Sequence, residues 1–532
     1  MKPTRVSGAA DLEIFRNLFV SIAEEMGTVL RKTAFSANIK ERRDYSCAVY
    51  DASGQTLAMG DHMPVHLGAM PLSVRHALDR FELGPGDVAI VNDPFRGGTH
   101  LPDITAVSGV FLGKPGRTKP KADFYVASRA HHADVGGMSP GSMPLAQEIY
   151  QEGLRIPPVL LFQGGEVVRD MMDLILANVR TPVEREGDLL AQVMAARRGE
   201  DRLREIASRY GLARVQRSAA QLLDYTERMT RAMLRTIPAG TYAFEDFLDS
   251  DGITDTPVRI AVTLRIGVEG VGRDEVEVDF TGTSPQVAGS VNANYAVAVS
   301  AAMYCFRCLI QADVPYNAGL LRPIRIFAPD RTVVSAGLPA AMAAGNVETS
   351  QRITDTILGA LAKAVPERIP AASSGTMNNL SFGGWDSLRN RPFAYYETIA
   401  GGMGASAAGA GRSATHTHMT NSWNTPTEAF EHQYPVRVRA YRIRGGSGGA
   451  GLHRGGDGIV RELEFLEDTD VTLLSDRRVR GPWGLAGGEA GAPGKNQVIS
   501  EGTVRDIPAK VRLGLKKHET LRIESPGGGG WG

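Results

Sequence analysis

Apolar side chains recur at helical spacing near the start of the chain. Within Asp11–Ala37 they stand three and four positions apart, from Leu12 to Leu30, which predicts an amphipathic helix. Asp11 is a suitable residue to cap its first turn. Similar spacing or composition predicts further helices over Met70–Phe81, Arg169–Asn178, Gly187–Tyr225 with an extension over Met229–Ile237, Asn292–Ala312 and Ser350–Val365.

Alternation of apolar and polar residues predicts strands beside short turn sequences. Tyr45–Asp51 and Gln55–Met59 flank Ala52-Ser53-Gly54, a pattern typical of a β-hairpin. Gly113–Ala122 is rich in Lys, Pro and Gly and predicts an exposed connection between two later strands. The other predicted strands are Asp87–Val91, Ile104–Leu112, Asp123–Arg129, Thr241–Phe244, Val258–Ile266, Val276–Phe280, Val436–Ile443, Gly458–Phe465 and Val471–Leu474.

These elements indicate an α/β fold of the mixed α+β kind with several domains, because 532 residues exceed what one core holds. We predict an N-terminal metal-site domain over residues 1–238 and a β-rich middle domain with an apolar helix over 239–345. A Gly-rich α/β region with a tail would occupy residues 346–532. The tail ends in Gly527–Gly530, which cannot form a regular element alone. Such a tail is usually disordered, but it could also thread into a crevice.

Composition narrows the class of protein. Lys plus Arg and Asp plus Glu are equal at 59 each, so no basic surface for nucleic acid or an anionic membrane is expected. No uncharged apolar stretch of eighteen residues is present, which predicts no membrane span. Three cysteines in the chain indicate a reducing compartment. The N-terminus lacks the apolar core of a signal peptide, and we expect a cytoplasmic protein.

Two short segments, Asn92–Asp103 and Ala127–Gly137, carry three histidines and several aspartates. His100 and Asp103 are three residues apart at a predicted strand end. His131 follows 28 residues after Asp103, enough for a pair of strands to bring the two together. Imidazole and carboxylate ligands are typical of catalytic Zn, Mn or Fe sites with one position open for substrate. We therefore predict that His100, Asp103 and His131 bind a divalent metal.

His131 and His132 are adjacent, so in a strand their side chains point to opposite faces. Only one of them can easily share an ion with His100, and we prefer His131. We place His132 and Asp134 among the candidate catalytic residues, as support for the ligands or as substrate contacts. The alternative for the whole cluster is a set of polar loop residues satisfied by the backbone.

Further polar clusters are candidates for substrate contacts. Glu41, Arg43 and Asp44 lie with Arg42 in a dense charge cluster that could hold a substrate carboxylate or phosphate. The alternative is a solvated ion-pair surface. Gly345–Arg352 could hold an anion at a helix start, or Thr349 or Ser350 could simply cap that helix. We select as substrate-binding candidates Asn346, Glu348, His418 and Asn421.

The segment His416–Glu428 contains His418 and Asn421 among alternating polar residues. They could line a pocket, and His416 or His418 could add a metal ligand. Thr425-Pro426 with Glu428 instead resembles a capping box, which is purely structural. The chain contains neither a Walker motif, a Rossmann fingerprint after a first strand, nor a Gly-x-Ser-x-Gly elbow. No nucleotide site is therefore apparent.

At these motifs the sequence resembles the hydantoinase B/oxoprolinase family. Family members are subunits of ATP-dependent enzymes that open cyclic amides such as hydantoins, 5-oxoproline and lactams. Related proteins are subunits of acetone- and acetophenone-type carboxylases. The resemblance extends over almost the whole chain and is carried by Asn38–Cys47, Asn92–Asp103, His131–Gly137, His418–Pro426, Ser475–Arg477 and Pro526–Gly530.

The resemblance implies a partner subunit of hydantoinase A type that binds ATP with Mg and phosphorylates the substrate carbonyl oxygen. This chain would receive the activated intermediate in a hetero-oligomer of α2β2 or larger size. The family pattern assigns the metal to His100, Asp103 and His131. The chain is shorter than typical carboxylase subunits, which favours the hydrolase branch. The alternatives are a carboxylase subunit that uses bicarbonate in place of water, and a non-catalytic scaffold for the ATPase.

Overall fold

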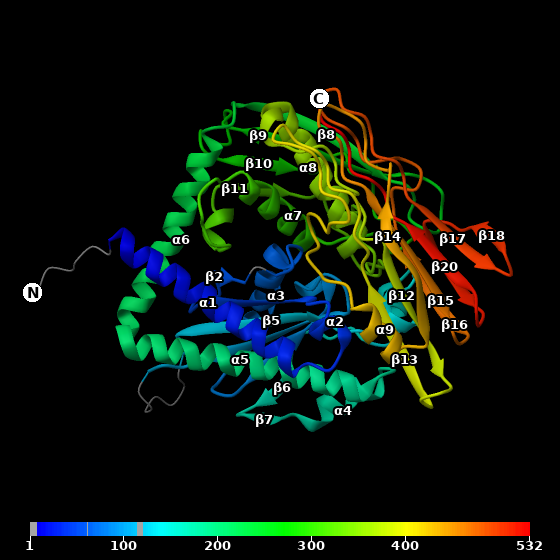
Figure 1. Cartoon of the computed structure of the whole chain (residues 1–532). Coiled ribbons are helices and arrows are strands. Elements are labelled where there is room, and N and C mark those ends of the chain that lie inside the picture. The colour runs from blue at the N-terminus through cyan, green and yellow to red at the C-terminus, as the bar shows by residue number, and fades with distance from the viewer. Residues whose placement is uncertain (1–7, 61, 114–120) are drawn as a thin grey trace, which may run out of the picture.

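The computed structural model describes residues 8–60, 62–113 and 121–532. Over these residues the chain has a mixed α+β fold with four β-sheets (Figure 1). The exposed connection predicted at Gly113–Ala122 lies mostly outside the described residues. Within the described part, no helix is long and apolar enough to cross a membrane.

The helices and strands have the following bounds. The helices are α1 (Ala9–Thr33), α2 (Ala37–Lys40), α3 (His66–Arg80), α4 (Arg169–Ala177), α5 (Pro182–Tyr210), α6 (Leu212–Leu234), α7 (Tyr295–Cys308), α8 (Ser350–Ala364) and α9 (Thr427–Gln433). The strands are β1 (Tyr45–Asp51), β2 (Thr56–Met59), β3 (Val88–Val91), β4 (Asp103–Val110), β5 (Phe124–His131), β6 (Val159–Gln163), β7 (Glu166–Val167), β8 (Gly240–Leu248), β9 (Val258–Ile266), β10 (Val276–Asp279), β11 (Ile324–Phe327), β12 (Asn379–Asp386), β13 (Arg391–Glu397), β14 (Val436–Arg444), β15 (Gly458–Phe465), β16 (Thr469–Leu474), β17 (Lys495–Ser500), β18 (Thr503–Asp506), β19 (Lys510–Leu515) and β20 (Thr520–Glu524).

The first sheet has the order β2-β1-β5-β4-β3-β6-β7, and its strands β1 to β5 are buried on both faces. Helices α1 and α5 contact one face, and α3 contacts the other. Successive residues of β1 therefore enter different cores. Cys47 and Val49 pack with the α1 and α5 side, whereas Ala48 and Tyr50 pack with the α3 side. This two-residue period also decides which histidine reaches which face, as shown below.

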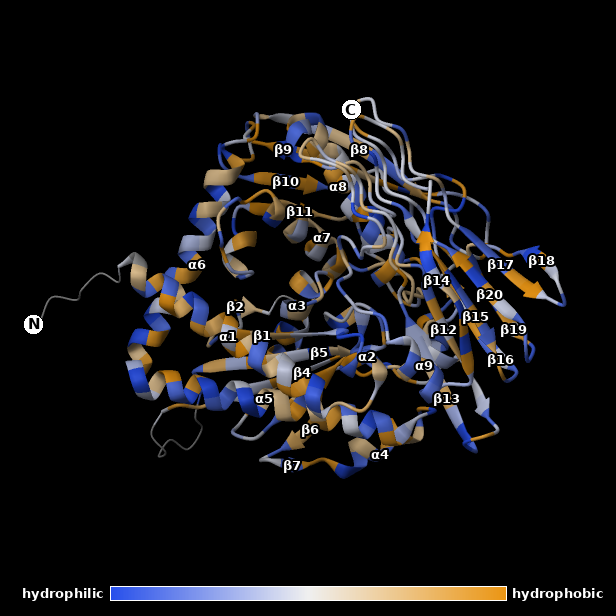
Figure 2. Ribbon diagram, viewed as in Figure 1, coloured by the Kyte–Doolittle hydropathy of each residue, from blue (hydrophilic) through white to orange (hydrophobic). Residues whose placement is uncertain are grey.

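The second sheet, in the order β11-β10-β9-β8, packs against α8, and α7 lies between α8 and α3. Figure 2 shows hydrophobic residues along β9 and β10, and apolar residues of both strands share one core with α7 and α8. The approach of α3 to α7 is close because α3 has a glycine there. A Cβ on Gly68 would lie 2.5 Å from Val299 Cγ1, and its amide donates to Ser300 Oγ at 3.0 Å. One continuous core thus joins the first two sheets.

The C-terminal third contains two sheets that pack face to face. Their orders are β13-β12-β16-β19 and β14-β15-β20-β17-β18. Phe382 and Tyr395 from one sheet share a core with Leu463 and Ile523 from the other, and Phe430 of α9 joins them. These sheets lie together at one side of the molecule in Figure 1.

Glycine-rich segments form a separate layer of extended chains beside these sheets. They run side by side toward the C-terminus in Figure 1 and appear pale in Figure 2. Gly528 donates to Gly456 O at 2.9 Å, and Gly529 donates to Ala372 O at 2.8 Å. A Cβ on Gly530 would lie 2.0 Å from Ala450 O. The C-terminal tail is therefore threaded between neighbouring backbones, which was the second of the two predicted possibilities.

The main differences from the predicted elements concern helix starts and C-terminal strands. Helix α3 begins at His66, four residues before the predicted start. The predicted cap of α8 is wrong, because a π-helical turn over Gly345–Thr349 precedes the helix, and Thr349 has helical backbone angles without a side-chain cap. In this turn the Val347, Glu348 and Thr349 amides bond Ala344 O and the Gly345 amide bonds Met342 O, so these four amides are not free to hold an anion. Strands β12, β13 and β17 to β20 were not predicted. The domain boundaries remain predictions.

Candidate metal centre

Strands β4 and β5 form an antiparallel pair in which Asp103 lies directly opposite His131. His131 is the last residue of β5, and Asp103 is the first residue of β4. His100 lies in the turn just before β4, where the Asp103 amide bonds its carbonyl at 3.2 Å. All three side chains lie on the α3 side of the first sheet and are at most 2% exposed. The register thus assembles the three residues that sequence spacing selected.

One carboxylate oxygen connects the two imidazoles. Asp103 Oδ1 lies 3.0 Å from His100 Nε2 and 3.2 Å from His131 Nδ1. One ligand atom from each of the three residues lies within 4.8 Å of the others. The rings of His100 and His131 meet edge to face with centroids 5.0 Å apart. Their nitrogens and the carboxylate therefore converge on one small volume.

Two further side chains, Asn346 and Tyr396, contact this triad. Asn346 Nδ2, from the π-helical turn before α8, lies 3.2 Å from His100 Nε2 and 3.4 Å from Asp103 Oδ2. Tyr396 of β13 stacks on His131 with ring centroids 4.3 Å apart. The residues come from the first sheet, from the segment before α8 and from a C-terminal sheet. The centre therefore forms where three parts of the fold meet.

His66 is a site residue that sequence reasoning missed. It is the first residue of α3, and its Nε2 lies 3.2 Å from Asp103 Oδ2. Its Nδ1 lies 2.8 Å from Ser46 Oγ. Thr99 also donates its hydroxyl to Asp103 Oδ2 at 3.1 Å. The sequence contained one usable indication, because His66 is one of two histidines closely preceding the predicted helix.

Charge in this buried cluster changes the protonation of its members. Burial raises the pKa of Asp103, but the charge of His100 and hydrogen bonds from three histidines hold that pKa well below its usual range. Burial lowers the pKa of His100, but the charge of Asp103 and the hydrogen bond to it raise the pKa overall. For His131 burial dominates and the pKa is lowered. Asp103 is therefore an anion, as a metal ligand must be.

The donor set fits a divalent cation. Two imidazoles and a carboxylate converge, and no other group of three potential ligands was found among the described residues. His131 Nε2 is buried without a hydrogen-bond partner in the described part of the chain, although buried polar groups are normally paired. An ion held by His100, Asp103 and His131 would draw one carboxylate and two imidazoles into a common coordination sphere, as Zn, Mn and Fe sites use.

Asp44 and Arg42 lie beside the triad. The carbonyl of Asp44 accepts from the His131 amide at 3.0 Å, and the negative charge of Asp44 raises the pKa of both His100 and His131. Its carboxylate lies 3.8 Å from Arg42 Nη1. Arg42 is fully buried and also donates to Tyr396 O at 3.0 Å. The charge cluster therefore contributes one carboxylate close enough for its charge to act on both histidines of the triad.

The other members of that cluster point elsewhere. Glu41 follows α2 and is partly exposed. Arg43 has a positive φ of 55° and its guanidinium lies 3.4 Å from the ring centroid of Trp423. Within the described residues Arg43 makes no ion pair, and its side chain is partly exposed. Its N–H donors remain available at the surface next to Asp44.

His132 and Asp134 lie apart from the triad. His132 is on the opposite face of the sheet, where its Nε2 lies 3.0 Å from Gln192 Oε1 of α5. Burial lowers its pKa to about 4. Asp134 accepts from the Gly136 amide at 3.0 Å and from Arg180 Nη1 at 2.9 Å. These contacts stabilise the turn after β5 and do not bring either side chain to the metal centre.

Glu348 is connected to the triad through two intermediate side chains. Its Oε1 accepts from Asn379 Nδ2 at 2.8 Å, and Asn379 Oδ1 accepts from the Tyr396 hydroxyl at 2.7 Å. Tyr396 in turn stacks on His131. Burial and the nearby charge of Asp476 raise the pKa of Glu348 to about 7. Of the predicted substrate-binding residues, Asn346 and Glu348 thus lie at or near the centre.

His418 and Asn421 are placed differently. His418 Nδ1 lies 3.4 Å from the Tyr304 hydroxyl, and its Nε2 lies 3.7 Å from Asp355 Oδ1. It therefore borders a buried ionic network rather than the triad. Asn421 is exposed and donates to His62 O at 3.2 Å.

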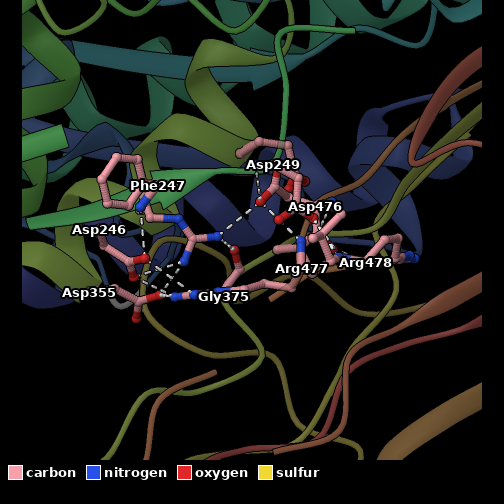
Figure 3. A network of polar contacts seen from close by, with 12 residues as sticks. Asp246, Phe247, Asp249, Asp355, Gly375, Asp476, Arg477 and Arg478 are labelled. Atoms are coloured by element: carbon pink, nitrogen blue, oxygen red, sulfur yellow. Dashed lines mark hydrogen bonds and ion pairs between the residues drawn. The ribbon is translucent and has the colours of Figure 1, made fainter. Parts of the chain in front are cut away.

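That ionic network joins three parts of the fold (Figure 3). Arg352 of α8 lies 3.1 Å from Asp246 of β8, 3.2 Å from Asp355 and 3.1 Å from Asp476, which follows β16. Arg477 contacts Asp246 and Asp355 as well. The motif Ser475-Asp476-Arg477 therefore serves to lock α8, the second sheet and a C-terminal sheet together.

Comparison with known families agrees with the resemblance seen in the motifs. The model for hydantoinase B/oxoprolinase matches residues 9–532. The chain belongs to the hydantoinase B/oxoprolinase family. It is 39% identical to 5-oxoprolinase 1 of Arabidopsis thaliana over 99% of this chain, which spans 42% of that protein. It is 31% identical to a putative D-/L-hydantoinase subunit of a Pseudomonas strain, over 96% of this chain and 88% of that protein.

Solved structures confirm the fold. The crystal structure of an ATP-dependent caprolactamase from Pseudomonas jessenii matches with a TM-score of 0.90 and 28% identity, over 99% of this chain and 92% of that chain. An acetone carboxylase structure matches with a TM-score of 0.87 and 17% identity, over 98% of this chain and 75% of that chain. The second likeness concerns the fold alone.

Proposed function

We propose that this protein is the metal-containing subunit of an ATP-dependent hydrolase that opens a cyclic amide. The observation that carries the proposal is the buried triad of His100, Asp103 and His131 in a chain of this family. Relatives named for 5-oxoproline, hydantoin and caprolactam support a substrate of hydantoin, 5-oxoproline or lactam type. The three cysteines are unpaired, which supports the predicted cytoplasmic location.

The use of ATP is assigned to a partner. An amide is a poor electrophile, and phosphorylation of its carbonyl oxygen creates a better leaving group before water attacks. We assign that step, with ATP and Mg, to a hydantoinase A-type subunit, because this sequence contains no recognised nucleotide motif. The Pseudomonas relative is named as one subunit of a hydantoinase, which supports a hetero-oligomer, and we propose an α2β2 or larger assembly.

The residues of this chain then have distinct proposed roles. A divalent ion on the triad supplies a Lewis acid and a water of lowered pKa. Asp44 would serve as the base for such a water, because its negative charge acts on both histidines of the triad. Asn346 orients the substrate near His100. Arg43, with free N–H donors on a flat guanidinium, holds the phosphoryl group by paired hydrogen bonds.

The test is co-purification with the hydantoinase A-type partner, followed by metal analysis and ATP turnover with a panel of cyclic amides. We expect one divalent ion per copy of this chain and ATP turnover that depends on one cyclic amide. Ring opening should fail in the His100→Ala complex. Full ring opening by that complex without metal would favour a scaffold role and contradict the proposal.

A carboxylase is the second candidate, because the fold also matches an acetone carboxylase. In that reaction bicarbonate would take the place of water at the same centre. Labelled bicarbonate separates the two: incorporation of label into product, with ketones in place of cyclic amides as substrates, would identify a carboxylase.

A further inference from the structure

Glu152 is a fully buried acid that makes no ion pair with the described part of the chain. It follows a short helical turn, Ile149–Gln151. Its Oε1 accepts two backbone N–H groups from a distant segment, Met342 at 2.7 Å and Ala343 at 2.8 Å. Its Oε2 is buried and makes no hydrogen bond with the described residues. One side-chain oxygen thus holds two consecutive peptides in place.

The two segments also contact each other along their backbones. The Ile149 amide donates to Pro339 O at 2.9 Å, and Glu148 forms an isolated antiparallel bridge with Ala340. On the other side, Gly345 packs so closely on Asn292 that a Cβ there would lie 1.8 Å from its carbonyl oxygen. These contacts hold the backbone of residues 339–345 in one position. Near the end of this segment, the hydrogen bonds from Met342 and Ala343 to Glu152 attach it to the turn after Ile149–Gln151.

This anchored segment delivers two groups to His100. The carbonyl of Ala343 lies 3.2 Å from His100 Nδ1. A carbonyl oxygen can only accept a hydrogen bond, so Nδ1 carries the proton. Three residues later, Asn346 Nδ2 lies 3.2 Å from His100 Nε2. In the neutral ring this arrangement leaves the lone pair of Nε2 directed at the centre of the triad.

We propose that Glu152 is a positioning residue of the metal centre: it holds the Met342–Ala343 peptides so that Ala343 O keeps the proton of His100 on Nδ1 and leaves Nε2 for the ion. The inference rests on the proposed metal site. The peptide carbonyl bonded to a ligating histidine fixes its tautomer and ring orientation, and loss of such support typically weakens metal binding about 10- to 100-fold. Here that support depends on a carboxyl group 52 residues away from His100 in sequence.

The test compares Glu152→Met with Glu152→Gln. Methionine fills a similar volume but provides no oxygen acceptor, whereas glutamine keeps an Oε1 that can accept from both amides. Metal-free protein is titrated with Co²⁺ against a competing chelator, and the visible absorption of bound Co²⁺ is recorded. We expect the dissociation constant to rise about 10- to 100-fold in Glu152→Met, with an altered Co²⁺ spectrum. Glu152→Gln should stay within about threefold of the wild-type protein.

A second measurement separates positioning from general loss of structure. Hydrogen exchange in the metal-free protein should become faster at the Met342 and Ala343 amides in Glu152→Met, while the β4 and β5 amides remain protected. If Glu152→Met does not fold, Glu152→Asp, which withdraws the carboxylate by one methylene, is used in the same titration. Unchanged Co²⁺ affinity and spectrum in the folded variant would overturn the inference. Failure of the wild-type protein to bind Co²⁺ would instead overturn the metal site itself.

Discussion

His66 at the start of α3 and Asp103 at the start of β4 meet at 3.2 Å, although 37 residues separate them. Asp103 thereby receives contacts from three imidazoles, of which only His100 and His131 supply atoms to the potential metal group. His66 contacts Oδ2 of this carboxylate, whereas Oδ1 lies against the imidazoles of His100 and His131. The His66 contact comes from the helix and not from the strands.

His66→Phe should therefore weaken metal binding while leaving the ligands present. We expect about a tenfold rise in the metal dissociation constant, because the carboxylate loses an orienting hydrogen bond. Equilibrium competition with a chelator measures the change. His76→Ala is the matched control, since His76 lies on the same helix away from the triad. Equal affinities for the His66→Phe variant and the wild-type protein would show that Asp103 needs no such partner.

His131 and His132 are adjacent in β5, but their side chains lie on opposite faces of the sheet. Substitution of each by alanine should therefore have a different effect. His131→Ala should abolish stoichiometric metal binding, because it removes one of three ligands. His132→Ala should retain the ion but lower the melting temperature, because Gln192 loses its buried partner at a cost of about 1–3 kcal/mol. Metal content by mass spectrometry and thermal unfolding measure the two effects. The reverse pattern would mean that β5 has the other register.

Much of this centre could be predicted from the sequence because side chains alternate between the two faces of a strand. The period of two in β5 separated His131 from His132, and the 28 residues between Asp103 and His131 left room for the strand pair that aligns them. His66 could not be placed in the same way. Pro71 suits a first helical turn, so the pattern favoured a later start for α3, whereas the structure has this proline inside the helix.

The C-terminal third was harder to predict for a related reason. Strand β12 contains Gly383 and Gly384, and glycine normally weakens a strand. The structure shows why Gly383 is used: a Cβ there would lie 2.4 Å from Pro140 Cβ. Because β13 and β12 were not predicted from the sequence, their residues Tyr396 and Asn379 were not recognised as neighbours of the site. Contacts between segments that are hundreds of residues apart in sequence determine the positions of these strands. A local pattern of apolar and polar residues carries no information about such contacts.

Glu348 should make stability depend on pH. Its pKa is raised from an ordinary value of 4.5 to about 7 in the folded protein. Between these values the folded state holds a proton that the unfolded state has lost, so the free energy of unfolding falls as pH rises. The contribution is complete below pH 4.5 and is lost by about pH 7, with a slope of at most about 1.4 kcal/mol per pH unit.

Glu348→Gln removes this titration. The melting temperature of the variant relative to the wild-type protein should therefore rise between pH 5 and pH 7.5 at constant ionic strength. Calorimetry at four pH values in that window is sufficient. Parallel curves for the two proteins would show that Glu348 is already ionised when the protein is folded at pH 5.

The ionic network of Figure 3 should be costly to break at Arg352. Arg352→Met would leave the carboxylates of Asp246, Asp355 and Asp476 in a buried cluster with less positive charge. Removal of one partner from a buried ion pair typically costs about 3–5 kcal/mol, so a large fall in melting temperature is expected. Arg512→Met, at an exposed pair with Asp470, should cost about 1 kcal/mol or less. Similar losses in the two variants would contradict this difference.

The C-terminal glycines give a prediction about the threaded tail. A Cβ on Gly528 would lie 2.1 Å from Met403 O, and neither backbone can move without breaking the bonds between adjacent extended chains. Gly528→Ala should therefore lower stability by about 1–3 kcal/mol or more, the usual cost of overpacking. Gly445→Ala is the matched control, because a Cβ there meets nothing within 4 Å and its φ is not positive.

Thermal unfolding and limited proteolysis of the tail measure the effect of Gly528→Ala. Because Ala405 donates to Gly529 O at 2.9 Å, a displaced tail should also expose residues 401–411 to protease. A stable Gly528→Ala variant with an uncleaved tail would mean that these chains can separate without cost.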